Sequence, residues 1–158
     1  MLRNRKSMLK KPNVLVDTSF LLPALGFEIE PEAMGIIRFF RKVNIYYIEA
    51  GLMEAVWKIL RHVKNNRELM IAKLGIESIR NTYTLVNPPS EAYIEAIKIY
   101  NQGHKDLIDS LHYATAKTLG LIWLTIDYDF IKFLRRHNYP VDGIIIDHRE
   151  FRKLVTGT

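Results

Sequence analysis

Residues 13–19 read Asn-Val-Leu-Val-Asp-Thr-Ser, a short apolar run that ends in an aspartate and two hydroxyl side chains. A second apolar run, residues 121–125, is followed by Asp127 and Asp129. Apolar runs of about 4–8 residues are typical of parallel strands that helices cover on both faces. Ligands of such sheets bind beyond the carboxyl ends of the strands. The sequence therefore predicts one acidic pocket to which two strands, remote in sequence, each contribute a carboxylate.

Strand patterns and helix patterns alternate along the chain and predict an α/β fold with a parallel sheet and right-handed crossovers. Helical stretches are indicated by apolar residues spaced three and four apart, by capping residues and by terminating glycines. The predicted strands are residues 13–17, 45–48, 84–86, 121–125 and 144–146. The predicted helices are residues 31–42, 50–62, 65–80, 90–101, 105–119 and 128–137.

The composition is typical of a soluble globular protein, with 48% hydrophobic and 25% charged residues. Residues 1–12 are expected to form a basic leader and residues 13–158 a single domain. No apolar run approaches the roughly 20 residues that cross a bilayer, and we expect neither a membrane segment nor a secretion signal. The absence of cysteine excludes disulfides and thiolate metal sites, and is typical of a reducing cytoplasm.

The formal net charge of +6 favours a polyanionic partner such as nucleic acid. Combined with an acidic pocket that suits a metal ion, this basic balance has the electrostatics of a nuclease. Five basic residues of the leader are candidates for binding a nucleic-acid backbone, although a solvated tail is the favoured explanation of them. These residues are Arg3, Arg5, Lys6, Lys10 and Lys11.

The acids that follow apolar runs also have a structural explanation, because an aspartate just before a helix is a common N-cap. This explanation applies to Asp17, where Thr18 or Ser19 would share the role, and equally to Asp127 and Asp129. Asp147, which follows the fifth apolar run, is a positional rival to all of them. Position alone therefore nominates more acids than one site needs.

Further acids on the predicted helices are equally ambiguous. Asp106 and Asp109 lie in the first turns of one helix, off its apolar stripe, where the helix dipole favours carboxylates. Glu54 lies opposite the apolar stripe of its own helix, and an exposed ion pair with Lys58 accounts for it. The histidines show no zinc-type spacing, so we do not predict a histidine ligand set.

Four short motifs occur in a fixed order along residues 13–147: an apolar strand ending in Asp and Thr-Ser, a helical glutamate, an acid followed by a small-residue helix, and a Thr-x-Asp-x-x-Phe segment. They read Val14-Leu15-Val16-Asp17-Thr18-Ser19, Leu52-Met53-Glu54-Ala55-Val56, Asp109-Ser110-Leu111-His112-Tyr113-Ala114-Thr115-Ala116 and Leu124-Thr125-Ile126-Asp127-Tyr128-Asp129-Phe130. Together they resemble the PIN domain, a family of metal-dependent ribonucleases that includes the VapC-type toxins of toxin–antitoxin pairs.

The resemblance implies a three-layer α/β/α fold with a five-stranded parallel sheet in the order 3-2-1-4-5. This order places strands one and four side by side. The ends that carry Asp17 and Asp127 then become neighbours, in agreement with the positional argument.

The resemblance also selects among the acids. It selects Asp109 over Asp106. It also assigns Glu54 to the acidic site, although an exposed ion pair with Lys58 would explain this residue as well. It takes Asp127 as the fourth catalytic acid, with Asp129 as an auxiliary metal ligand, and it passes over Asp147.

Clustered carboxylates cannot all ionise without compensation, because like charges raise one another's pKa. Oxygen ligands favour Mg²⁺ or Mn²⁺ over zinc, so we expect the four acids to hold one or two such ions. The expected reaction is metal-dependent hydrolysis of phosphodiester bonds in single-stranded RNA. Thr18, Ser19 or Thr125 are expected to orient water or phosphate.

The resemblance to VapC-type toxins further implies a protein antitoxin as partner and a homodimer. Two other functions stay open at this point. One is a PIN-like module that binds RNA or protein without cutting. The other is a phosphotransfer protein, although phosphatases of the haloacid-dehalogenase type require a second aspartate where Ser19 stands. The sequence does not separate a toxin from an RNA-processing nuclease.

Overall fold

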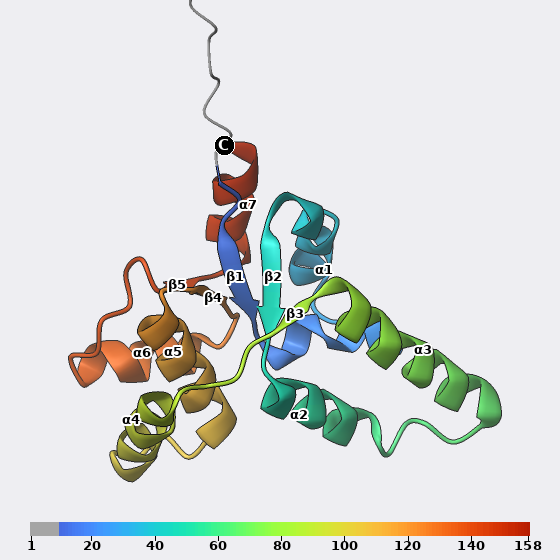
Figure 1. Cartoon of the computed structure of the whole chain (residues 1–158), viewed down its shortest axis with the longest axis horizontal. Helices are drawn as coiled ribbons and strands as arrows, with labels where there is room; N and C mark the ends of the chain where they lie inside the picture. Colours follow the sequence, from blue (N-terminus) through green and yellow to red (C-terminus); the bar gives the residue numbers. More distant parts are fainter. Residues whose placement is uncertain (1–9) are drawn as a thin grey trace, which may run out of the picture.

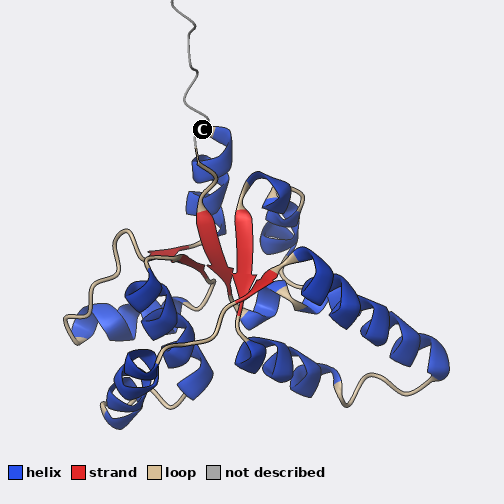
Figure 2. Ribbon diagram, in the orientation of Figure 1, coloured by secondary structure: helices blue, strands red, loops and turns tan. Residues whose placement is uncertain are grey.

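The structure, a computed structural model, describes residues 10–158 and shows helices on both sides of one sheet (Figures 1 and 2). The sheet has five strands in the order β3-β2-β1-β4-β5, and every neighbouring pair is parallel. This arrangement confirms the predicted α/β/α fold class and the predicted strand order. The strands are β1 (Asn13–Val16), β2 (Asn44–Tyr47), β3 (Thr84–Leu85), β4 (Ile122–Leu124) and β5 (Ile145–Ile146).

The helices begin and end at residues that the sequence marks clearly. Asn65 and Glu68 form a reciprocal capping box at the start of α3, and Gly120, with φ 68°, ends α5 in the left-handed conformation. Among residues 10–158, no helix is both long and apolar enough to span a membrane. The α-helices are α1 (Pro31–Ile37), α2 (Glu49–Ile59), α3 (Asn66–Thr82), α4 (Ser90–Asn101), α5 (Leu107–Leu119), α6 (Tyr128–Arg136) and α7 (His148–Thr156).

Side chains alternate across the central strand β1, so the sheet has a hydrophobic core on each face. Val14 and Val16 point into one core, which α1, α2, α3 and α7 cover. Leu15 points into the other core, which α4, α5 and α6 cover. Figure 1 shows α1–α3 and α4–α6 on opposite sides of the sheet. Burial on both faces explains why β1 is a continuous apolar run rather than an alternating one.

The structure differs from the predicted elements at two places. The helix predicted over residues 31–42 ends at Ile37, and a separate 3₁₀ turn covers Phe40–Lys42. The break lets Phe40 turn into the core, where its ring lies 6.1 Å from Phe20 and 5.7 Å from Phe151. The second difference is α7, for which the sequence analysis predicted no helix. Its capping box, Asp147 with Glu150, was the available signal.

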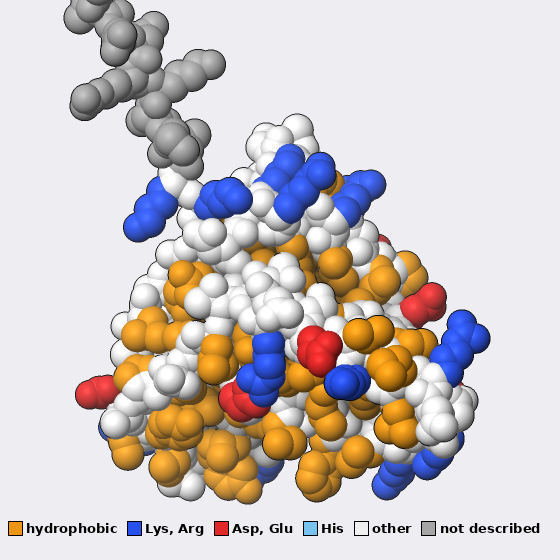
Figure 3. All heavy atoms as spheres, turned by 45° about the vertical axis from the view of Figure 1, so that its right-hand side comes forward, with side chains coloured by type: hydrophobic (Ala, Val, Ile, Leu, Met, Phe, Trp, Pro, Cys, Tyr) orange, Lys and Arg blue, Asp and Glu red, His pale blue; other side chains and the backbone are white. Residues whose placement is uncertain are grey.

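Helices α2 and α3 carry a row of large apolar side chains that remain exposed. Trp57 on α2 is 73% exposed, and Met53 and Leu60 on the same helix are also exposed. Between the two helices lies an apolar groove of about 520 Å³. Figure 3 shows hydrophobic side chains gathered on this side of the molecule. Exposed apolar patches of this kind mark interaction sites in soluble proteins.

Gly75 of α3 is required by a close approach between this helix and the chain before it. A Cβ atom added at Gly75 would lie 2.1 Å from the carbonyl oxygen of Ala24. The substitution Gly75→Ala is therefore expected to lower the free energy of unfolding by about 1–3 kcal/mol, through forced displacement of backbone. Urea denaturation of the purified protein measures this change.

The matched control is Gly35→Ala in α1, where an added Cβ would meet only the Arg152 side chain at an ordinary 3.5 Å. This variant is expected to be neutral or to gain up to about 1 kcal/mol, because alanine is the better helix former. Equal denaturation midpoints for the two variants would show that α3 has no tight contact at Gly75.

Candidate metal centre

The site begins where β1 and β4 end side by side. The Asp17 backbone N–H donates to the Leu124 carbonyl oxygen at 3.0 Å, which extends the strand pairing by one residue. Both carboxylate oxygens of Asp17 are held: Oδ1 accepts from the Thr18 N–H at 2.7 Å and Oδ2 from the Thr125 hydroxyl at 2.9 Å. Asp17 is only 6% exposed. Two strands remote in sequence therefore fix one buried carboxylate.

The second buried acid is Asp109, in the first turn of α5. Asp106 caps this helix, since its carboxylate accepts from the Ile108 and Asp109 backbone N–H groups, both at 3.0 Å. With capping assigned to Asp106, the Asp109 side chain is free to face the strand ends. Asp109 is 6% exposed, so the expectation that it lies off the buried side of α5 is wrong. Helix α5 is buried on nearly all sides from Asp109 to Ala116.

Asp127 combines capping with a place beside the two buried acids. Its carboxylate accepts from the Phe130 N–H at 3.0 Å and caps α6, and its own N–H donates to the Thr125 hydroxyl at 3.2 Å. Its negative charge helps to raise the pKa of both Asp17 and Asp109. Asp127 therefore caps α6, as its position predicted, and also lies in the acidic cluster with Asp17 and Asp109.

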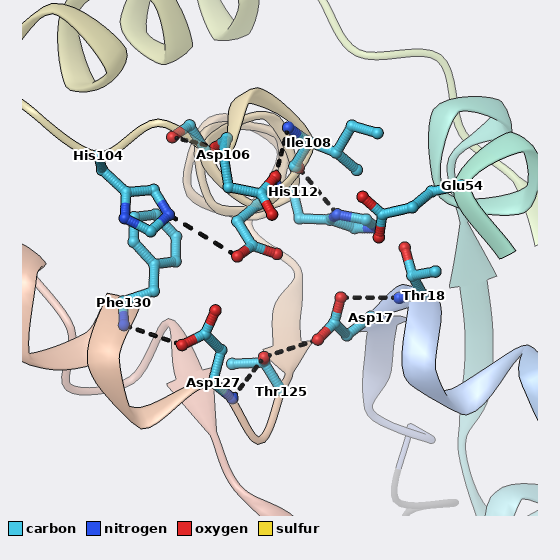
Figure 4. A network of polar contacts seen from close by, with 12 residues as sticks. Asp17, Thr18, Glu54, His104, Asp106, Ile108, His112, Thr125, Asp127 and Phe130 are labelled. Atoms are coloured by element: carbon cyan, nitrogen blue, oxygen red, sulfur yellow. Dashed lines mark hydrogen bonds and ion pairs between the residues drawn. The ribbon is translucent and has the colours of Figure 1, made fainter. Parts of the chain in front are cut away.

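Glu54 of α2 approaches the same cluster from the opposite side. Figure 4 shows its carboxylate directed toward Asp17 and His112. Its side chain is 18% exposed and lies 3.5 Å from the Lys58 ammonium, so the predicted i,i+4 ion pair is present. The charge of Lys58 also lowers the pKa of Asp17. Glu54 therefore forms its surface pair and faces the acids at once.

Two histidines that the sequence analysis did not assign also lie here. The His104 Nε2 atom is 3.7 Å from Asp109 Oδ2, and its ring stacks on Phe130 at 4.2 Å. The His112 ring is fully buried, and one of its nitrogen atoms lies within 4.8 Å of a carboxylate oxygen of Asp17 and one of Asp109. Its position one helical turn after Asp109 was the sequence signal, because residues i and i+3 share a helix face.

Burial sets the protonation of the cluster. It is the main cause that raises the pKa of Asp17 to about 6, opposed by the hydrogen bonds from Thr125 and Thr18. Burial, followed by the charge of Asp17, raises the pKa of Asp109 to about 10. Burial also lowers the pKa of His112 to about 4, so its ring is neutral at neutral pH. Without a cation, the two acids cannot both ionise at moderate cost.

The donor set fits a divalent cation. Asp17 and Asp109 offer carboxylate oxygens, the usual ligands of Mg²⁺ and Mn²⁺. The Nε2 atom of His112, a residue of the same cluster, is buried and has no hydrogen-bond partner in the described structure. A cation there would offset the carboxylate charges that raise both pKa values.

The other predicted site residues lie around this centre or outside the described residues. Thr18 is buried and Ser19 partly buried, both directly after Asp17. Asp129 is exposed in the first turn of α6. Asp147, the positional rival, caps α7 and accepts a hydrogen bond from the Tyr128 hydroxyl at 3.1 Å.

The basic leader is only partly described. Lys10 and Lys11 are exposed, and the Lys11 ammonium donates to the Arg41 carbonyl oxygen at 3.2 Å. The other predicted contacts, Arg3, Arg5 and Lys6, lie outside the described residues.

The chain thus combines a parallel α/β/α sheet with a cluster of acids beyond the carboxyl ends of β1 and β4, an arrangement that fits a divalent cation. The family model of the PIN domain, a family of nucleases, matches residues 14–135, and the chain belongs to this family. None of the curated proteins compared with the chain matches it.

Solved structures share the fold at low sequence identity. PAE2754 from Pyrobaculum aerophilum is 15% identical with a TM-score of 0.61, covering 93% of this chain and 97% of its own. VapC20 from Mycobacterium tuberculosis, a sarcin-ricin loop cleaving toxin, is 17% identical with a TM-score of 0.56, covering 75% and 93%. The DNA-bound VapBC of Salmonella typhimurium is 15% identical with a TM-score of 0.56, covering 87% and 98%.

The raised pKa of Asp17 predicts how stability changes with pH. The carboxyl binds its proton more tightly in the folded protein than in the unfolded chain, where its pKa is about 3.9. Its contribution to stability is therefore present below about pH 4 and is lost as the pH rises through about 6. Asp17→Asn is expected to remove this loss and to raise the unfolding free energy of the metal-free protein at pH 7.5 by up to about 3 kcal/mol. Urea denaturation in EDTA between pH 4 and 8 measures it.

Asp142→Asn is the matched control, because Asp142 is exposed and paired with Arg135 at 3.0 Å, away from the cluster. This change is expected to alter stability by no more than about 1 kcal/mol at any of these pH values. A loss of stability at pH 7.5 in Asp17→Asn that exceeds the control would contradict the electrostatic account.

Proposed function

We propose that this protein is an endoribonuclease that hydrolyses phosphodiester bonds of single-stranded RNA with Mg²⁺ or Mn²⁺. The observation that carries the proposal is the convergence of Asp17 and Asp109, both buried, with Asp127 beside them at the carboxyl edge of the sheet. Membership of the PIN family supports nuclease chemistry at this edge.

We assign the metal to Asp17 and Asp109, with Asp127 and Glu54 completing the set and Asp129 as an auxiliary. A bound cation would lower the pKa of an attacking water and stabilise charge on the scissile phosphate. The Thr125 hydroxyl, which donates to Asp17, holds that carboxylate in place. Lys58 supplies positive charge near Asp17, where a phosphate would approach.

Two hydroxyl side chains, Thr18 and Ser19, directly follow Asp17. The Thr18 hydroxyl oxygen is buried and has no hydrogen-bond partner among the described residues. Thr18 and Ser19 are therefore assigned to orient water or phosphate. The basic leader, including Lys10 and Lys11, is assigned to the RNA backbone, whose negative charge it complements.

Asp17→Asn is expected to reduce RNA cleavage by at least about 100-fold, because it removes a metal-binding oxygen. The Asn amide can still accept from the Thr18 N–H and donate to the Thr125 hydroxyl, so the fold is retained. Cleavage of a labelled single-stranded RNA in Mg²⁺ or Mn²⁺, with and without EDTA, measures the effect.

Asp142→Asn, an exposed acid outside the cluster, is expected to cleave like the wild type. Cleavage that continues unchanged in EDTA would refute the metal mechanism. Metal binding at Asp17 without any cleavage would instead favour the non-catalytic PIN-like module as the function.

We further propose that this protein is the toxin of a toxin–antitoxin pair and that it acts in the cytoplasm as a homodimer. The structural neighbours include VapC20 and VapBC, a toxin and a toxin–antitoxin complex. The exposed apolar side chains of α2, including Trp57, and the groove beside them support a protein partner.

Expression of the wild-type chain in a bacterial host is expected to arrest growth, whereas Asp17→Asn is expected to leave growth normal. Coexpression of a small protein encoded beside this gene is expected to restore growth of the wild type. Colony counts after induction measure both effects. Normal growth with the active wild type would favour an RNA-processing role instead.

A further inference from the structure

The His112 imidazole has one nitrogen that is fully used and one that is not. Nδ1 lies 2.9 Å from the Ile108 carbonyl oxygen, one turn back in α5. Nε2 is buried without a hydrogen-bond partner in the described structure. Buried polar atoms in folded proteins are nearly always paired, so an orphaned nitrogen calls for a specific explanation.

The contact at Nδ1 fixes which nitrogen carries the proton. A carbonyl oxygen only accepts hydrogen bonds, so Nδ1 bears the hydrogen and Nε2 of the neutral ring presents its lone pair. A neutral imidazole with its other N–H bonded to a backbone carbonyl is the usual form of a histidine that binds metal.

Packing on two sides holds the ring in this orientation. One face stacks on the Trp123 indole, with the ring centroids 5.7 Å apart and the planes within 5° of parallel. On another side the backbone of α2 approaches so closely that a Cβ added at Gly51 would lie 3.0 Å from Nε2. The ring therefore cannot rotate without displacing a helix or the indole.

We propose that His112 Nε2 binds directly to the divalent cation held by Asp17 and Asp109. This inference rests on the proposed metal-dependent function, and it makes the site a mixed nitrogen and oxygen centre rather than an all-oxygen one. One ring nitrogen of His112 and one carboxylate oxygen of each aspartate lie within 4.8 Å of one another, and Nε2 is the nitrogen that the Ile108 contact leaves available. Figure 4 shows His112 on the same side of the cluster as Glu54 and Thr18.

A mixed ligand set changes which cation is favoured. Imidazole nitrogen binds transition ions well, whereas Mg²⁺ prefers oxygen ligands. Mn²⁺ accepts both, so the His112 ligand favours Mn²⁺ over Mg²⁺. The sequence analysis treated the two ions as equivalent because it assigned oxygen ligands alone.

A second arrangement would also satisfy the orphaned nitrogen. The Thr18 hydroxyl oxygen is buried and unpartnered too, and it lies 3.5 Å from the same added Cβ at Gly51. A water molecule between Thr18 and His112 would pair both atoms without metal contact. The experiment must therefore distinguish direct nitrogen coordination from a water bridge.

Mn²⁺ alone is the probe, added to the full-length protein at one equivalent and observed by pulsed electron paramagnetic resonance. Direct coordination predicts a ¹⁴N hyperfine coupling in the wild type. The coupling is expected to change to a ¹⁵N coupling when histidine is labelled with ¹⁵N. This measurement needs no substitution, so it shows whether a histidine nitrogen binds the ion even if a variant fails to fold.

His112→Phe keeps a ring against Trp123 and removes the ligand atom. It is expected to lose the nitrogen coupling and to weaken Mn²⁺ binding by at least about tenfold, with a smaller loss for Mg²⁺. Calorimetric titration with each metal measures both affinities. If this variant is unfolded by circular dichroism, His112→Gln takes its place.

The matched control is His137→Phe. Its Nδ1 makes the same contact to the carbonyl oxygen four residues back, at 2.9 Å to Phe133, but the ring is exposed and outside the cluster. Coupling and affinity are expected to stay as in the wild type. His104→Phe, beside Asp109, is also expected to keep the coupling, which assigns the signal to His112.

The outcomes separate this inference from the function on which it rests. Suppose that Mn²⁺ binds to the wild type but not to Asp17→Asn, and that no nitrogen coupling is observed. This result would overturn direct coordination by His112 and leave the metal-dependent nuclease proposal intact. Mn²⁺ that binds equally to the wild type and Asp17→Asn would refute the metal site itself.

Discussion

The repulsion between two buried carboxylates, Asp17 and Asp109, is the constraint on which the rest of this structure depends. Desolvation and mutual repulsion oppose the ionisation of both, as their raised pKa values show. The surrounding chain holds the pair together despite this cost. Pairing of β1 with β4 fixes Asp17 through Thr125, and Asp106 fixes the start of α5. A fold that holds two carboxylates close together without a metal ion is preorganised for a cation, because the cation would neutralise the repulsion between them.

The fold was largely predictable because its strands are buried on both faces and its helices end at recognisable residues. Apolar runs located all five strands to within about two residues, a normal uncertainty for element ends. The errors have a tertiary cause. Helical periodicity continues past Ile37, but the aromatic cluster around Phe40 needs a turn there that no local pattern encodes. The missed helix α7 has a clear capping box and only a short apolar stripe.

Prediction of the site depended on two different kinds of information. Position at strand ends pointed to Asp17 and Asp127, and the structure brings both ends together. Helical periodicity gave the wrong burial for Asp109, because a periodicity argument assumes that one face of the helix is exposed to solvent. Helix α5 packs in the core with α4 and α6 and is buried on nearly all sides. Only the resemblance to the PIN family selected that acid. His112 had only its i,i+3 spacing from Asp109 as a sequence signal, and the packing of its ring against Gly51 and Trp123 is a tertiary feature that no spacing encodes.

The bond between Thr125 and Asp17 joins residues 108 positions apart, so the cluster is assembled from the two ends of the domain. A chain emerging from the ribosome exposes Asp17 early, but its neighbour strand follows only after most of the domain has been translated. The growing polypeptide therefore cannot assemble this acidic cluster until the strand before Thr125, 108 positions after Asp17, has been synthesised.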